Sequence, residues 1–102
     1  MQISTKYQNQ VLHIRLFGEM DEHTAGKVRR EADECIERYT DCKTEVFDLR
    51  EITFMDSTGI GFLIGRYKTY KKRGVPIFIV NPSQNTDKIL EMSGVYTLIP
   101  KL

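Results

Sequence analysis

Residues 53–61 read TFMDSTGIG, and they mark the point at which the pattern of the chain changes from strand to helix. Before them, residues 44–49 (TEVFDL) form a short segment that favours a strand. After them, apolar residues recur at the intervals of one helical face, namely Ile60, Leu63, Ile64 and Tyr67. The helix that begins at this junction, the second along the chain, is predicted to end at Gly74. The quoted stretch is therefore the junction around which the fold is organised.

The segment toward the N-terminus predicts a hairpin. Residues 11–17 (VLHIRLF) alternate between apolar and polar side chains, which is the period of a half-buried strand. Its apolar positions are Leu12, Ile14 and Leu16, and its polar positions are His13 and Arg15. A shorter strand at residues 3–7 pairs with it through the polar turn at residues 8–10.

Two further helices and two further strands complete the predicted fold. Residues 24–40 show helical spacing, and a short helix at residues 87–92 ends at Gly94. Residues 76–80 are apolar throughout, as expected for a strand covered on both faces, and a last strand is predicted at residues 96–99. The order is β-β-α-β-α-β-α-β. Helical crossovers imply parallel pairing, so we predict an α/β fold with a mixed sheet of four to five strands and packed helices.

Composition limits the function classes. The chain has 102 residues, 40% of them apolar, so we predict one domain, residues 1–102. Its net charge of +1 predicts no general affinity for nucleic acid or an anionic membrane. The sequence shows no secretory h-region and no membrane-length apolar run, which predicts a soluble, cytoplasmic protein. Cys35 and Cys42 lack a metal-binding spacing and are expected to be reduced, with Cys35 in the core. We expect no metal and no cofactor.

A nucleophilic serine is the first chemical reading of the junction. The nucleophile elbow requires Gly-x-Ser-x-Gly, but Met55 occupies the first glycine position. Both histidines, His13 and His23, precede Ser57, whereas the triad of the elbow runs Ser, acid, His. The sequence therefore disfavours a hydrolase.

A phosphate cradle and a nucleic-acid patch are also weakly supported. Gly59, Gly61 and Gly65 follow G-x-G-x-x-x-G instead of G-x-G-x-x-G, and close helix packing is the simpler reason for them. The basic residues of the second helix are Arg66, Lys68, Lys71, Lys72 and Arg73. We interpret them as a solvated face, with Tyr67 on the buried stripe.

Ser57 lies between two residues that can also cap the start of a helix. Asp56, Ser57 and Thr58 are all good N-cap types, and a helix needs only one. The excess suggests an accessible surface as well as a cap. Residue types alone leave open whether Ser57 is the cap or a modified residue.

Three motifs resemble a known family. GEMDEHTA (18–25), FMDSTGIGFLIGRYK (54–68) and LEMSGV (90–95) are similar to motifs of the STAS domain family of bacterial anti-anti-sigma factors, and most of all to its sporulation members. The resemblance covers nearly the whole chain in the same order. Met20 replaces the leucine that is usual in the Gly-Glu-x-Asp box, and the resemblance implies a further C-terminal helix beyond Leu102.

The resemblance implies a STAS fold and a protein-binding switch, not an enzyme. The unphosphorylated protein would bind an anti-sigma factor that is also a serine kinase and so release a sporulation sigma factor. That kinase would phosphorylate Ser57, and a PP2C-type phosphatase would reset the switch. The implied partner-binding residues are Asp21, Met55, Asp56, Thr58, Gly59, Ile60 and Gly61. The alternative function is that of a STAS module that binds a small ligand or a nucleotide.

Overall fold

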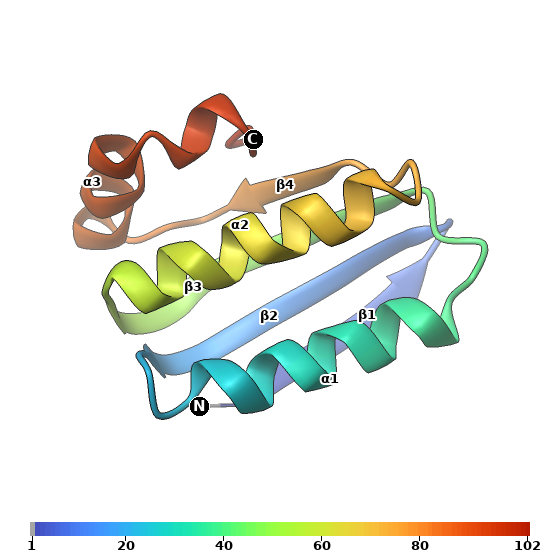
Figure 1. Cartoon of the computed structure of the whole chain (residues 1–102), viewed down its shortest axis with the longest axis horizontal. Coiled ribbons are helices and arrows are strands. Elements are labelled where there is room, and N and C mark those ends of the chain that lie inside the picture. The colour runs from blue at the N-terminus through green and yellow to red at the C-terminus, as the bar shows by residue number, and fades with distance from the viewer. Residues whose placement is uncertain (1) are drawn as a thin grey trace.

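Strands and helices alternate along the chain in the computed structural model, which describes residues 2–102. The elements are β1 (Gln2–Gln8), β2 (Val11–Met20), α1 (Ala25–Arg38), β3 (Thr44–Met55), α2 (Ser57–Lys71), β4 (Ile77–Val80), α3 (Gln84–Ser93) and the 3-10 helix η1 (Val95–Thr97) (Figure 1). The predicted α/β class is confirmed. Met1, which the predicted domain of residues 1–102 includes, lies outside the described residues.

The four strands form one mixed sheet in the order β1-β2-β3-β4. β1 pairs antiparallel to β2, whereas β2 with β3 and β3 with β4 pair parallel, as predicted. The hairpin turns at Asn9 and Gln10, whose φ angles are 54° and 62°. Two consecutive positive φ angles are the signature of a type I′ turn, whose twist matches that of the flanking strands.

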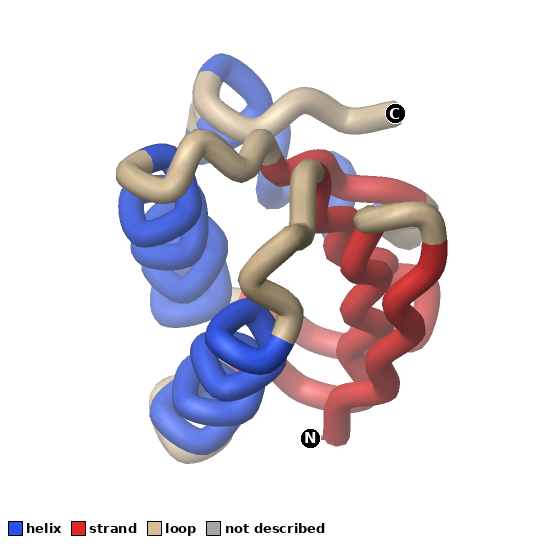
Figure 2. The backbone as a smooth tube through the Cα atoms, turned by 90° about the vertical axis from the view of Figure 1, so that its right-hand side faces the viewer, coloured by secondary structure: helices blue, strands red, loops and turns tan. Residues whose placement is uncertain are grey.

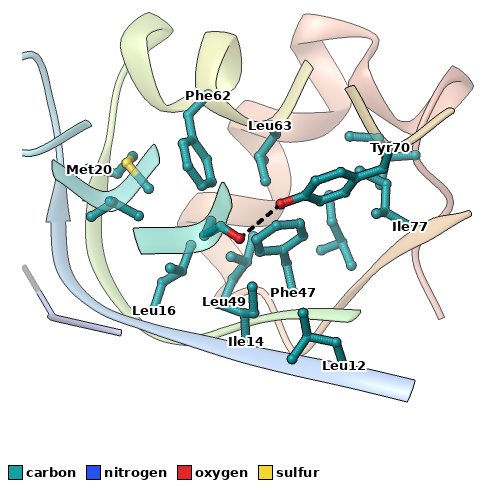
Figure 3. Close-up of a cluster of buried hydrophobic side chains, with 14 of the residues drawn as sticks. Leu12, Ile14, Leu16, Met20, Phe47, Leu49, Phe62, Leu63, Tyr70 and Ile77 are labelled. Atoms are coloured by element: carbon teal, nitrogen blue, oxygen red, sulfur yellow. Dashed lines mark hydrogen bonds between the residues drawn. The ribbon is translucent and has the colours of Figure 1, made fainter. Parts of the chain in front are cut away.

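Helices α1 and α2 cover the same face of the sheet (Figure 2). Both crossovers proceed in one direction across the sheet, and right-handed connections then place their helices on one side. The core lies between the two layers (Figure 3). Its largest fully buried side chains include Leu12, Ile14, Leu16, Phe47, Leu49, Leu63 and Tyr70. Cys35 is also buried there, as predicted, and both cysteines are free thiols.

The buried face of α2 differs from the predicted one: of the four predicted residues only Leu63 is buried, whereas Ile60, Ile64 and Tyr67 are half-buried. Tyr70 is fully buried, and its hydroxyl donates to the Ala32 carbonyl at 3.3 Å (Figure 3), whereas Tyr67 is only partly buried. Arg66, expected on the solvated face, is 6% exposed and forms an ion pair with Asp33 of α1. Apolar residues occur all around the first half of α2, so periodicity could not identify the face that meets the sheet.

The predicted strand at residues 96–99 is wrong. The chain there forms η1, in which the Thr97 N–H donates to the Gly94 carbonyl at 3.0 Å and the Ile99 N–H donates to the Val95 carbonyl at 2.8 Å. Val95 and Ile99 are both buried, and their spacing of four residues fits a helical turn and not a strand. Beyond η1, Lys101 forms a single parallel bridge to Ile79 of β4.

β4 is covered less completely than its apolar sequence predicts. Ile77 and Ile79 are buried beneath the helices, whereas Phe78 and Val80 are half-buried on the opposite face, which α1 and α2 leave open (Figure 2). Within residues 2–102, no helix has the length and apolar character of a membrane span.

One carboxyl group lies within the core. Glu45 of β3 is 0% exposed, and neither of its carboxyl oxygens has a hydrogen-bond partner within the described part of the chain. Burial raises the pKa of Glu45 to about 9, and the nearby Arg66 guanidinium opposes that shift only in part. Burial therefore favours the protonated, neutral form of the Glu45 carboxyl group.

Candidate functional site

The candidate site lies where β2 and β3 end side by side. Met20 and Met55 are register partners in the parallel pair, and the Asp56 N–H donates to the Met20 carbonyl at 3.4 Å. Asp21 and Asp56 are consequently the first residues beyond two neighbouring strands. Loops at the carboxyl ends of parallel strands are the common location of binding sites in α/β folds.

Asp56 is the N-cap of α2. Its Oδ1 accepts hydrogen bonds from the Thr58 N–H at 2.9 Å and the Gly59 N–H at 3.4 Å. Two of the donors that a helix start leaves unpaired are thereby satisfied. Asp56 has an extended backbone, with φ −118° and ψ −165°, as expected of a capping residue.

Asp21 organises the preceding loop in the same way. Its Oδ1 accepts from the His23 N–H at 2.9 Å and the Thr24 N–H at 3.2 Å, the same two-residue and three-residue steps that Asp56 makes. Its carbonyl also accepts from the Ala25 N–H at 3.0 Å, at the first residue of α1. Two aspartate turns of one geometry thus form adjacent loops on this edge of the sheet.

Ser57 is the first residue of α2 and is exposed. Its hydroxyl makes no hydrogen bond with any residue from 2 to 102, because Asp56 already caps the helix. His13 and His23 form no hydrogen bond with Ser57 either. The hydroxyl is thus available at the surface, in the positive field of the α2 N-terminus.

The predicted partner-binding residues fall into two groups. Asp21, Asp56, Thr58 and Ile60 are half-buried and Gly61 is exposed, so all five present atoms at the surface. Met55 and Gly59 are buried beneath them.

Gly59 is required for close packing at the start of α2. A Cβ atom at this position would lie 2.6 Å from Met55 Cγ and 2.7 Å from Met20 Cγ. Such distances are far below van der Waals contact, so only glycine lets the first turn of α2 approach the ends of β2 and β3. Met20, Met55 and Gly59 therefore form the buried layer beneath the surface residues of the candidate site.

Phe54 is a neighbouring surface residue that the sequence did not indicate. Ile52 pairs with Gly18 and Phe54 with Glu19, so Thr53 is an extra residue in β3, which makes a bulge. The bulge changes the alternation, turns Met55 into the core and leaves Phe54 48% exposed. Strand periodicity contains no signal for a bulge.

The chain as a whole matches a known protein family. The chain belongs to the STAS domain family, whose model matches residues 2–102. The predicted fold and the resemblance are therefore confirmed.

Two kinds of relative are similar over most of the chain. An anti-sigma F factor antagonist of Paenibacillus polymyxa is 36% identical over 98% of this chain and 85% of its own length. The structure of the anti-sigma factor antagonist SpoIIAA in its unphosphorylated form superimposes with a TM-score of 0.81 at 24% identity, over 99% of this chain and 88% of that one. The phosphorylated form of the Bacillus cell fate determinant SpoIIAA gives a TM-score of 0.73 at 24% identity, over 99% and 91%. The solved structures show the shared fold.

Proposed function

We propose that this chain is an anti-anti-sigma factor whose unphosphorylated form binds an anti-sigma factor through the surface around Ser57. The observation that carries the proposal is the exposed Ser57 hydroxyl, which the fold does not use, at the start of a helix capped by its neighbour. The 36% identity to an antagonist of anti-sigma F supports this partner class and favours a sporulation sigma factor as the one released. The chain acts in this proposal as a binding protein and not as an enzyme.

The proposed switch is phosphorylation of Ser57 by the anti-sigma factor, which would also be a serine kinase. A PP2C-type phosphatase would remove the phosphate. That a SpoIIAA has been solved in a phosphorylated form supports this kind of control. Ser57 is suited to it because a kinase can reach its hydroxyl without opening the helix.

A phosphate here would act on the partner surface more than on the fold. Phosphoserine adds about −1.5 to −2 charges near neutral pH, and the α2 N-terminus favours a negative charge by about 0.3–1 kcal/mol. The fold should therefore survive. By contrast, a like charge about 6 Å away, on Asp21 or on the partner, costs about 0.7–2.8 kcal/mol for effective dielectric constants of 80 to 20. Each 1.4 kcal/mol or so weakens binding about tenfold.

Site mapping tests the proposal. The protein is incubated with its cognate anti-sigma factor and ATP, digested, and analysed by mass spectrometry, with Ser57→Ala as the control. We expect one phosphate, on the peptide that contains Ser57, and none on the variant. Phosphate on Thr58 or Ser83 with Ser57 unmodified would contradict the proposal.

A further inference from the structure

Two glycines of α2 have no role in the packing of this chain. A Cβ atom at Gly61 or at Gly65 would meet no described atom within 4 Å apart from its chain neighbours and the adjacent backbone of α2 itself, in contrast to the tight contact at Gly59. Glycine inside a helix costs about 0.5–1 kcal/mol relative to alanine. The fold would therefore be at least as stable with alanine at both positions, so their role lies outside folding.

Both glycines line a groove between α1 and α2. The groove has a volume of about 400 Å³, and Ala25 and Gly26 of α1 face Gly61 and Gly65 across it. All four residues are small, so side chains at these positions would fill the groove. It begins at Thr58, beside Ser57, and is thus continuous with the surface assigned above to the anti-sigma factor.

Two arginine side chains, Arg29 and Arg66, also line the groove. Arg66 lines it and is 6% exposed, and its Nε has no hydrogen-bond partner within residues 2–102, although the other end of the guanidinium pairs with Asp33. Arg29 lines it from α1, is exposed, and forms no ion pair in the described structure. The acid at the rim, Glu22, lies near His23, with 3.8 Å between Oε1 and Nε2. Arg29 is therefore the cation of the groove that has no acidic partner within residues 2–102.

We infer that this groove receives an acidic side chain, Asp or Glu, from a segment of the anti-sigma factor, with the carboxylate held by Arg29 and the segment backbone close to the glycines. This inference rests on the proposed function and extends the proposed partner surface from Thr58 and Gly61 toward α1. Arginine binds carboxylates in a bidentate manner, and glycines permit the close approach of another chain. A second copy of this chain fits poorly, because a two-fold interface centred on the groove would bring Arg29 against its own copy.

Filling the groove tests the inference without disturbing the fold. Gly65→Leu should keep the thermal midpoint at or above that of the wild type but weaken binding of the purified cognate anti-sigma factor about tenfold or more, measured by calorimetry. Lys68→Leu, an exposed change on the same helix outside the groove, should leave the affinity within about twofold. Equal affinities for the wild type and Gly65→Leu would overturn the inference. The proposed function would stand in that case if Ser57→Asp, which places a negative charge at the proposed phosphorylation site, weakened binding of the anti-sigma factor.

Charge reversal identifies the chemistry of the occupant. Arg29→Glu should weaken binding about tenfold or more, whereas Arg38→Glu, the same charge change at an exposed position in the last turn of α1 and outside the groove, should have a much smaller effect. One Asp→Lys or Glu→Lys variant of the anti-sigma factor should restore affinity for Arg29→Glu and not for Gly65→Leu. The inference would be overturned if no acidic position rescued Arg29→Glu, or if inorganic phosphate or ATP bound the isolated wild type tightly and Gly65→Leu abolished that binding.

Discussion

Asp56 and Ser57 are adjacent in the chain but serve different purposes. The Asp56 carboxylate caps α2 by accepting the Thr58 N–H at 2.9 Å, whereas the Ser57 hydroxyl is exposed and bonds to nothing in residues 2–102. The group that stabilises the helix is therefore not the group proposed to be modified. A charge can be added to Ser57 without removing the cap.

This division predicts different stabilities for two alanine variants. Asp56→Ala should lower the free energy of unfolding by about 1 kcal/mol, with a range of about 0.5–2, because it leaves the Thr58 and Gly59 N–H groups unpaired. Ser57→Ala should change it by less than about 0.5 kcal/mol. Urea unfolding measures both. A loss at Ser57→Ala as large as that at Asp56→Ala would show that the serine also caps the helix.

The glycines of α2 predict opposite effects of the same substitution. Gly59→Ala should destabilise the protein by about 1–3 kcal/mol, because its Cβ would meet Met20 and Met55 at 2.7 and 2.6 Å. Gly61→Ala should be neutral or stabilise by up to about 1 kcal/mol, because the new Cβ atom would meet no described residue outside the adjacent part of α2 within 4 Å and alanine favours the helix. Thermal unfolding of the pair gives the comparison. Similar midpoints for the two variants would show that α2 does not pack closely on the strand ends.

Glu45 predicts a stability that falls as the pH rises. Its pKa is raised from 4.5 to about 9 in the folded protein, so between these values the folded state holds a proton that the unfolded chain has released. The free energy of unfolding should therefore decrease from about pH 5 toward pH 9, by an amount on the order of 1–3 kcal/mol at pH 7. Glu45→Gln, which cannot ionise, should remove this decrease. If the two proteins show parallel stability curves from pH 5 to 8, Glu45 is ionised in the folded state.

The ion pair between α1 and α2 predicts strong coupling of its two members. Asp33→Ala leaves the buried Arg66 guanidinium without its partner and should cost about 1–3 kcal/mol, whereas Glu34→Ala, at an exposed position on the same helix, should be nearly neutral. Adding Arg66→Met to Asp33→Ala should restore much of the loss. A double-mutant cycle in urea measures the coupling, and additive losses would contradict the pairing.

The element order as far as α3 and the junction were predictable because each leaves a local pattern. Alternation marks β2, helical spacing marks α1, and Gly94 ends α3 in the left-handed conformation that favours glycine. The capping residue types predicted the start of α2, and the proposal that Ser57 is modified came from motif resemblance. Only hydrogen-bond geometry decided that Asp56 is the cap.

The features that escaped prediction depend on contacts between distant residues. The burial of Arg66 requires Asp33, which comes from another helix, and the exposure of Phe54 results from a register shift against β2. The turn at Val95–Thr97 replaces a strand because Val95 and Ile99 reach the core together. Neither residue propensity nor hydrophobic periodicity contains information about such contacts.

The most direct test of the proposed switch compares two affinities for the cognate anti-sigma factor. The protein is prepared unmodified and phosphorylated at Ser57, and both forms are titrated by calorimetry under the same conditions, with circular dichroism to compare their folds. We expect both forms to be folded and the phosphorylated form to bind at least about tenfold more weakly. Equal affinities of two folded forms would contradict the central claim that a charge on Ser57 controls the partner surface.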